Sequence, residues 1–291
     1  MTIKKEAPLC PLCGKQENRI DISFERNCLR HCMFCDLFFT YPMPPIDSEF
    51  YNQDYYKSWG VAENSIPKHV LYLKERNMQK HLDRIKEFVS SGMILEIGSA
   101  WGAFLKVAEE AGYDILGLEL SKQACRFART IVKEDAVLNQ SLEETNLSPE
   151  SVDVIFMSDL LEHIPNPFPF IEKSVSLLKK GGIIYLITPN PSHWSRGVFG
   201  KSWVHYKDEH LMFFTGQTFS WISERLNLKI VEQSNHYKFI NFKYLDAQLN
   251  NFGYNYFGFL LSSLNSLLPD KLKEFLFPIP IGESIVIVQK N

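Results

Sequence analysis

Hydrophobic residues from Met93 onward fall into alternating strand-like and helix-like runs. The segments MILEIG, YDILGLEL and IIYLITPN are apolar over most of their length, as buried strands are, and SVDVIFMSDLLEHI reads as a strand with a loop. WGAFLKVAEEAG and SKQACRFARTIV carry apolar residues at helical spacing, DAVLNQ reads as a short strand, and IEKSVSLLKKGG as a helix ending at paired glycines. Strands separated by helices predict an α/β fold with a doubly wound, mostly parallel sheet.

Further elements flank this alternating region. Apolar residues at helical spacing predict an amphipathic helix from Lys68 to Ser91. Near the C-terminus, GQTFSWISERLNLKIVEQSN reads as a helix plus a strand, and IGESIVIVQK as the closing strand. Between them, an apolar and aromatic insertion at 238–280 fits a lid over a substrate, a dimer face or an interfacial membrane helix. Its stretch FGFLLSSLNSLL is too short to span a bilayer and lacks a basic face, which favours a lid or a subunit contact, including a homodimer.

The length of 291 residues allows one large domain with a small appendage. The chain is 45% hydrophobic and 22% charged, which is typical of a folded globular protein. We expect three parts: a head at 1–48, a connecting segment and helix at 49–92, and the main domain at 93–291.

Charge and targeting features narrow the choice of partner and compartment. The net charge is −3, and the first fifty residues hold six Lys/Arg against seven Asp/Glu. The absence of a basic stripe disfavours a nucleic-acid partner. The N-terminus lacks the apolar run of a signal peptide, and no stretch of about 18 apolar residues predicts a transmembrane helix, so we expect a cytoplasmic protein.

Five of the six cysteines lie within the first 35 residues. Two C-x2-C pairs, Cys10/Cys13 and Cys32/Cys35, are separated by 18 residues, a spacing typical of a tetrathiolate zinc site. Two intervening residues let one tight turn present both sulfurs to a tetrahedral ion. We therefore predict a structural Zn²⁺, because a head of this size has too little core to fold alone.

Other residues of the head have alternative interpretations. Cys28 and His31 are candidates to replace a ligand of the second pair, but Cys28-x3-Cys32 is the less usual spacing. The aromatic residues that follow the head either pack it against the main domain or form part of a substrate pocket, and packing is favoured. They are Phe50, Tyr51, Tyr55, Tyr56 and Trp59.

The segment ILEIGSAWGAF predicts a strand that enters a glycine-rich turn and then a helix. Such a turn leaves backbone N–H groups free at a helix N-terminus, at the sheet edge where α/β proteins bind ligands. Gly98-x-Ala100-x-Gly102 has alanine where a stricter fingerprint has glycine.

Two acids near this turn indicate the ligand. Glu119 closes the second strand about 20 residues beyond the turn, where a carboxylate accepts hydrogen bonds from ribose hydroxyls. Glu96 stands two residues before Gly98. A carboxylate there repels a pyrophosphate but favours a cofactor that carries an ammonium and a sulfonium. The alternative for Glu96 is a buried salt bridge.

Four ordered segments resemble the motifs of class I S-adenosylmethionine-dependent methyltransferases: ILEIGSAWGAF, GLEL, SDLLEHIPNP and LLKKGGIIYLITPN. The head, CPLCG followed by CMFCDLFFTYPMPP and FYNQDYY, is similar to the zinc-bearing N-terminus of methyltransferases of deoxysugar, polysaccharide and antibiotic biosynthesis, including sugar C-methyltransferases. The resemblance implies a Rossmann-like methyltransferase domain that acts on a small molecule, such as a carbohydrate or nucleotide-linked sugar.

The resemblance also implies where the cofactor binds. The methionine moiety would lie among residues of the glycine turn, the ribose on Glu119, and the adenine beside Leu120. Ser141 and Leu142 would flank the adenine edge, although many members have Asp at position 141. Asp159 and Leu160 would line the reacting end. The turn residues are Glu96, Gly98, Ser99, Ala100 and Gly102.

Candidates for a catalytic base lie beyond the fifth strand. EHLMFFT resembles a family segment whose Glu-His pair is catalytic in sugar C-methyltransferases, which implies His210 as general base and Glu209 as its partner or as a substrate ligand. The alternative is that EHL caps the next helix and that His210 packs in the core. Tyr206 and His205 are further candidate bases, whereas His163 is expected to organise a loop beside the cofactor.

Three other functions compete with a small-molecule methyltransferase. One is an RNA methyltransferase whose zinc head binds nucleic acid, which the acidic balance of the head disfavours. Another is a cofactor-binding scaffold without turnover. The third is a nicotinamide oxidoreductase, which Glu96 disfavours. The methyl acceptor and the atom methylated are not specified by the sequence.

Overall fold

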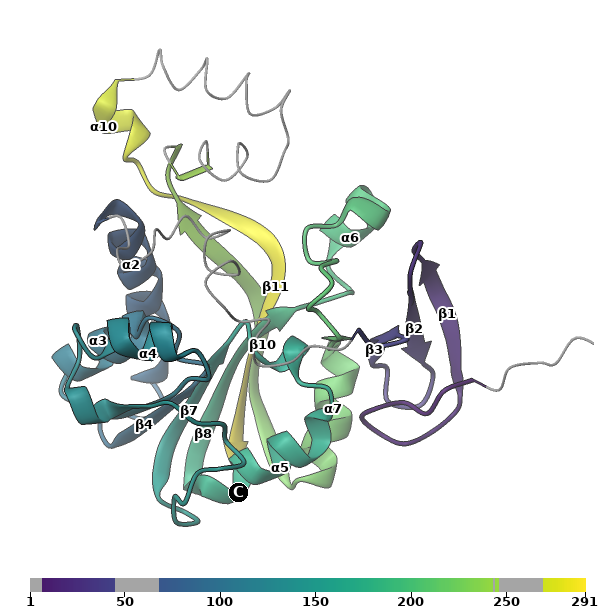
Figure 1. Ribbon diagram of the computed structural model, residues 1–291, viewed down its shortest axis with the longest axis horizontal. Helices are drawn as coiled ribbons and strands as arrows, with labels where there is room; N and C mark the ends of the chain where they lie inside the picture. Colours follow the sequence, from purple (N-terminus) through teal and green to yellow (C-terminus); the bar gives the residue numbers. More distant parts are fainter. Residues whose placement is uncertain (1–6, 45–67, 243, 246–268) are drawn as a thin grey trace, which may run out of the picture.

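A seven-stranded sheet forms the centre of the computed structural model, which describes residues 7–44, 68–242, 244–245 and 269–291 (Figure 1). The strand order is β10-β11-β8-β7-β4-β5-β6. Strands β4 to β8 of this sheet pair in parallel, whereas β11 is antiparallel to β8 and β10 is antiparallel to β11. The predicted doubly wound, mostly parallel sheet is therefore confirmed. Its strands are β4 (Met93–Ile97), β5 (Asp114–Leu118), β6 (Val137–Leu138), β7 (Val152–Ser158), β8 (Leu178–Pro189), β10 (Leu228–Ile240) and β11 (Phe277–Lys290).

Helices cover both faces of the sheet. Because successive strand residues point to opposite faces, Ile94 and Phe156 pack with α2 (Lys68–Ile85) and α3 (Ala103–Glu110). Leu95 and Met157, one residue along, pack with α5 (Pro167–Leu177) and α7 (Gly216–Arg225) on the other face. The remaining short elements are α4 (Lys122–Ala128), η1 (Glu134–Ala136), η2 (Leu161–His163), α6 (Trp194–Phe199), η3 (Gly200–Ser202) and α10 (Asp270–Lys273).

The N-terminal head is a small antiparallel sheet that continues into the main domain. Its strands β1 (Asn18–Ser23), β2 (Cys28–Cys32) and β3 (Phe38–Tyr41) are joined by β9 (Met212–Phe213), which pairs with β3. Leu37 and Phe39 of the head belong to the same hydrophobic core as α5 and α7. The division at residue 48 stays a prediction, but head and main domain share hydrogen bonds and a core.

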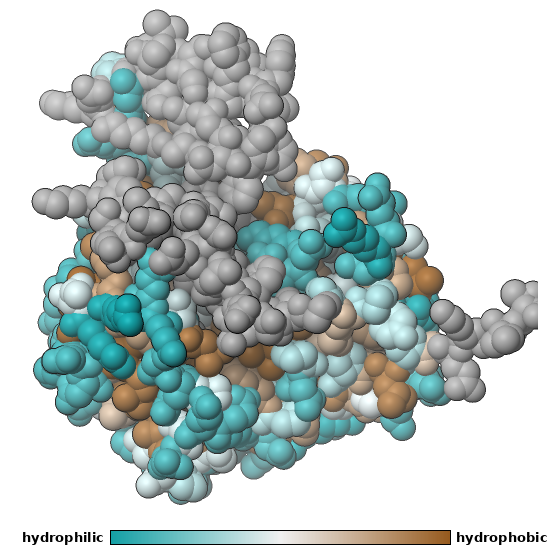
Figure 2. Space-filling model, viewed as in Figure 1, coloured by the Kyte–Doolittle hydropathy of each residue, from teal (hydrophilic) through white to brown (hydrophobic). Residues whose placement is uncertain are grey.

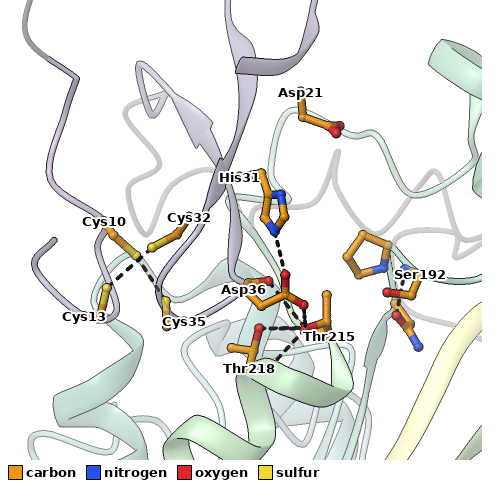
Figure 3. A network of polar contacts seen from close by, with 12 residues as sticks. Cys10, Cys13, Asp21, His31, Cys32, Cys35, Asp36, Ser192, Thr215 and Thr218 are labelled. Carbon is orange, nitrogen blue, oxygen red and sulfur yellow. Dashed lines mark hydrogen bonds and ion pairs between the residues drawn. The ribbon is translucent and has the colours of Figure 1, made fainter. Parts of the chain in front are cut away.

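A chain of polar contacts also joins the head to α7 (Figure 3). His31 Nε2 lies 2.6 Å from Asp36 Oδ1, and the Thr215 hydroxyl donates to Asp36 Oδ2 at 2.5 Å. Thr215 Oγ1 in turn accepts from the backbone N–H of Thr218 at 3.1 Å and caps α7. His31 and Asp36 therefore orient the head on the first turn of this helix.

Two predicted helix ends differ from the structure. The helix that begins at Lys68 ends at Ile85 rather than at Ser91. The helix before the paired glycines ends at Leu177, and Gly181 and Gly182 lie in β8, where the register with β7 shifts. A positive φ of 78° at Gly181 accommodates this irregularity.

Several expectations fall on other parts of the chain. The aromatic residues from Phe50 to Trp59 and positions 246–268 of the apolar insertion lie outside the described residues. In the part of the chain that the structure covers, no helix has both the length and the apolar character needed to cross a membrane.

On the face drawn in Figure 2, hydrophobic residues reach the surface among hydrophilic ones.

Candidate active site

A cavity of about 570 Å³ opens where the carboxyl ends of β4, β5 and β7 meet. Parallel strands place the loops that follow them at one edge of the sheet, so residues distant in sequence converge here. Helix α2 and strand β10 supply the facing wall, with Lys74, Asn77, Lys238 and Phe239. Of the eleven predicted cofactor-binding residues, all except Gly102 line this cavity.

The glycine turn after β4 has an unusual backbone conformation. Gly98, Ala100 and Gly102 all have positive φ, at 77°, 43° and 77°. A Cβ on Gly98 would lie 3.1 Å from the Leu160 side chain, and one on Gly102 would lie 3.0 Å from Ala128 Cβ. Gly102 therefore permits close packing of α3 against α4, while Gly98 keeps the backbone close to the cavity.

The Glu119 carboxylate holds this turn in place. Glu119 follows β5 directly and is only 8% exposed. Its Oε2 accepts from the backbone N–H of Ala100 at 2.9 Å, and its Oε1 accepts from that of Ser121 at 2.7 Å. One side chain thus connects the first turn of the site with the N-terminus of α4, and it faces the cavity.

Glu96 is the second buried acid of the site. It is 6% exposed, and its Oε2 has no hydrogen-bond partner among the described residues. Burial, and then repulsion from Glu119, raise the pKa of Glu96 well above its ordinary value. A cation in the cavity would favour the charged form, so Glu96 is suited to a positively charged ligand.

The other predicted cofactor residues border the same space. Leu120 is half exposed, whereas Leu142 is buried. The backbone N–H of Ser141 donates to Glu144 Oε2 at 2.7 Å, which fixes the loop after β6. Asp159, directly after β7, has a positive φ of 53° and therefore a strained backbone at the cavity wall.

Two lysines on the facing wall were not anticipated from the sequence. The Lys74 ammonium lies 4.4 Å from the centre of the Trp101 ring, and Lys238 approaches from β10. Burial and the nearby Lys238 lower the pKa of Lys74 to about 8. No local motif marks these residues, because they come from a helix and a strand more than 160 positions apart.

A buried histidine–glutamate contact near the same sheet edge was also not anticipated from the sequence. Glu283 lies in β11, opposite Pro189 of β8, where the pairing of these two strands begins. Its Oε2 is 2.7 Å from Nδ1 of His236 on β10. Only the antiparallel pairing of two distant strands brings them together. The sequence motif IGES identified the strand but not this partner.

The predicted catalytic residues Tyr206, Glu209 and His210 do not line the cavity. The Tyr206 hydroxyl accepts from Arg196 Nε, and its ring packs edge-on against Phe24 of the head. His210 is 5% exposed and lies edge-on to His163, at 4.9 Å between ring centres. His163 lines the cavity, and its Nδ1 is 3.0 Å from the Glu209 carbonyl oxygen.

The four predicted metal-binding cysteines converge in the head (Figure 3). Cys10 Sγ lies 3.6 Å from Cys35 Sγ, and Cys13 Sγ lies 3.6 Å from Cys32 Sγ. Four sulfurs around Zn²⁺ at about 2.3 Å are separated by about 3.8 Å, so this set fits a tetrahedral zinc ion. Cys28 lies outside the cluster and donates to the Tyr41 carbonyl oxygen at 3.3 Å.

Comparison with known sequences identifies the main domain. Residues 70–233 match the family model described as "Methyltransferase domain". Ubiquinone biosynthesis O-methyltransferase of Photobacterium profundum is 31% identical over 102 residues, 33% of this chain and 43% of that protein. The enzyme of that name from Xanthomonas campestris is 28% identical over 131 residues, 40% of this chain and 55% of that protein. This chain thus spans about half the length of these relatives.

Solved structures share the fold. A methyltransferase from Bacillus halodurans superposes with a TM-score of 0.51 at 16% identity. The superposition covers 73% of this chain and 98% of that protein. The plantazolicin methyltransferase BpumL, solved in complex with a triazolic desmethylPZN analog and S-adenosylhomocysteine, gives a TM-score of 0.52 at 16% identity. The superposition covers 84% of this chain and 94% of that protein.

The family match spans more than half of the chain and includes the glycine turn, both acids and β7. The Rossmann-like sheet and the cavity at its carboxyl edge agree with it. The chain belongs to the methyltransferase-domain family, and the prediction of a methyltransferase domain with a Rossmann-like fold is confirmed.

Proposed function

We propose that this protein transfers a methyl group from S-adenosylmethionine, bound in the cavity at the ends of β4, β5 and β7, to a small-molecule acceptor. One observation carries the cofactor assignment: two buried carboxylates, Glu96 and Glu119, flank the glycine turn of a 570 Å³ cavity. Glu119 suits the ribose of an adenosine cofactor or of a dinucleotide, whereas Glu96, next to the glycine turn, favours a positively charged adenosine sulfonium over a pyrophosphate.

Each acid has a distinct proposed role. Glu119 would accept hydrogen bonds from the ribose hydroxyls while it continues to hold Ala100 and Ser121. Glu96 would face the positively charged methionine end of the cofactor, which compensates its burial. Leu120, Ser141 and Leu142 would border the adenine, and Asp159 and Leu160 the reacting end.

The reaction is a displacement in line with the sulfonium bond. The acceptor atom forms a bond to the methyl carbon, the carbon–sulfur bond breaks with its electron pair on sulfur, and the acceptor loses a proton. The enzyme mainly positions the two partners. His210 as general base, with Glu209 or Tyr206 assisting, stays a prediction, because none of the three lines the cavity.

A carbohydrate or nucleotide-linked sugar is the proposed acceptor. It is supported by the resemblance of the head to that of sugar methyltransferases, and by two lysines, Lys74 and Lys238, whose ammonium groups suit an anionic acceptor. The ubiquinone-pathway names of the relatives describe those proteins, which match 33% and 40% of this chain.

We also propose that Cys10, Cys13, Cys32 and Cys35 bind a structural Zn²⁺. The ion would join the turn that carries the first pair to the end of β2. A cytoplasmic location and a homodimer stay predictions from the sequence.

Calorimetric titration tests the cofactor assignment. S-adenosylhomocysteine should bind the full chain tightly, and NADH should show no binding. Tight binding of NADH without binding of S-adenosylhomocysteine would overturn the proposal. Transfer of a labelled methyl group to candidate sugar nucleotides then tests the acceptor class.

A further inference from the structure

A second group of metal-ligating side chains lies between the cofactor cavity and the head. Glu162 and His163 belong to η2, which begins three residues after the end of β7, and His210 lies just before β9. One ligand atom from each residue lies within 4.8 Å of the others. All three side chains are buried, with Glu162 fully so.

Backbone hydrogen bonds hold the two segments together at this point. The Leu211 N–H donates to the Glu162 carbonyl oxygen at 2.8 Å, and the Thr40 hydroxyl of the head donates to the His210 carbonyl oxygen at 3.1 Å. The positions of Glu162 and His210 are therefore fixed by backbone contacts and do not depend on their side chains.

The orientation of His163 is that of a metal-binding histidine. Its Nδ1 lies 3.0 Å from the Glu209 carbonyl oxygen, which only accepts hydrogen bonds. Nδ1 must therefore carry the proton, and Nε2 has the lone pair. A backbone carbonyl on the other ring nitrogen is the usual support of a metal-bound imidazole.

Two polar atoms of the group have no hydrogen-bond partner in the described structure: Glu162 Oε1 and His210 Nδ1. The other carboxylate oxygen, Glu162 Oε2, accepts from the Thr188 hydroxyl at 3.0 Å, which orients the carboxyl group. Unpaired buried polar atoms are destabilising and rare. Because both belong to residues of one cluster whose ligand atoms lie within 4.8 Å of one another, we infer a cation that would pair with them.

We propose that Glu162, His163 and His210 form a binding site for a divalent transition-metal ion such as Zn²⁺. Two imidazoles and one carboxylate suit a borderline-soft ion, whereas Mg²⁺ and Ca²⁺ prefer oxygen ligands. Two ligand atoms that each lie about 2.1 Å from Zn²⁺ are about 3.4 Å from each other. The ligand atoms of the three side chains would therefore move roughly an ångström closer together to bind the ion.

The location gives this site a consequence for the enzyme. His163 lines the cofactor cavity, while His210 adjoins the strand that extends the head sheet. A bound ion would therefore connect the cavity wall to the head. A nitrogen that binds the ion has no lone pair for a proton, so occupancy excludes His210 Nδ1 as the general base. The proposal does not rest on the proposed methyl transfer.

Metal stoichiometry of the full chain tests the site. The protein is stripped of metal under reducing conditions, refilled with excess Co²⁺ and desalted. We expect two equivalents in the wild type, one with thiolate charge-transfer absorption and one with only weak visible bands typical of nitrogen and oxygen ligands. Glu162→Gln and His210→Gln should each keep one equivalent and the thiolate absorption.

Matched controls separate this site from a general effect of buried charge. Glu283→Gln removes another buried acid and His193→Gln another buried histidine, and both should retain two equivalents. One equivalent in the wild type, or two equivalents in Glu162→Gln, would overturn the proposal. The thiolate absorption of each variant reports whether the head has folded.

Cadmium-113 NMR of the wild type keeps the test independent of the variants. Two resonances, one in the tetrathiolate region and one in the nitrogen/oxygen region, are expected. A tetrathiolate resonance alone would contradict the second site. Binding of S-adenosylhomocysteine to the same samples reports on the proposed methyltransferase separately, because that measurement needs no metal in this site.

Discussion

The cysteine cluster of the head and the cofactor cavity achieve their geometry in opposite ways. In the head, two tight turns bring four sulfurs together, and each turn is encoded within four residues. In the cavity, single residues from the ends of β4, β5 and β7 and from α2 and β10 converge. They include a buried acid with one oxygen unpaired in the described structure, and backbone strain at Ala100 and Asp159. If the proposed functions hold, a metal stabilises the head, whereas the cavity keeps destabilising features that its ligand would relieve.

Loss of one cysteine should have the largest effect. Cys32→Ser should abolish metal binding in the head and lower the free energy of unfolding by several kcal/mol, since the free energy of metal binding is folding free energy. Metal analysis and urea denaturation measure both. Cys28→Ser is the matched control and should retain the metal; if Cys32→Ser retained it as well, the ligand set would be wrong.

Removal of the ribose acid should come next. Glu119→Ala should weaken S-adenosylhomocysteine binding by about 1–3 kcal/mol, because buried hydroxyls lose a charged partner. Calorimetry measures the affinity, and Glu110→Ala, which changes an exposed acid on α3, is the control. Equal affinities of Glu119→Ala and the wild type would remove Glu119 from the cofactor site.

Glu96→Gln should have opposite effects on the stability of the ligand-free protein and on the affinity for the cofactor. The pKa of Glu96 in the folded protein lies above its ordinary value of 4.5, so the folded state holds this proton more tightly than the unfolded state. The contribution of Glu96 to the free energy of unfolding therefore decreases as the pH rises from 4.5 to the pKa of the folded state. Glutamine, which stays neutral, should make the ligand-free protein more stable at pH 7.

The same substitution should weaken binding of S-adenosylmethionine. In the wild type, the cofactor's positive charge favours ionised Glu96, so affinity should rise with pH until the free carboxyl group is ionised. Chemical denaturation and calorimetry at pH 5 to 8 measure both effects. A lower stability of Glu96→Gln at pH 7, or an unchanged pH dependence of binding, would contradict this role.

The smallest effect should come from the ion pair between head and main domain. Asp21 pairs with Arg196, and both side chains are partly exposed. Asp21→Asn should change the free energy of unfolding by less than about 1 kcal/mol. The shared core holds the head more strongly, so Phe39→Ala should destabilise by about 3–5 kcal/mol. Urea denaturation compares the two variants, and a reversed order would show that charge fixes the head.

Local patterns were sufficient to predict most of the fold. The segments that form β4, β5, β7 and β8 are apolar over most of their length because both faces of these strands are buried, and the C-x2-C pairs specify their own turns. The helix before Gly181 was extended too far because paired glycines usually end a helix. Here they lie in a strand whose register shifts against β7.

The site was predictable only where its residues belong to a local motif. Glu96, Gly98 and Glu119 follow strand ends at characteristic spacings. Lys74, Lys238 and the His236–Glu283 pair depend on how α2, β10 and β11 pack, which no local pattern specifies. The neighbours of His210 depend in the same way on the loop that enters the head sheet.

A crystal structure with S-adenosylhomocysteine would test the cofactor assignment at atomic detail. The ribose hydroxyls should lie within hydrogen-bond distance of the Glu119 carboxylate, and the amino group of the ligand should lie on the Glu96 side of the glycine turn. A ligand bound elsewhere, or one whose ribose and amino groups avoid both acids, would contradict the proposed roles of Glu96 and Glu119.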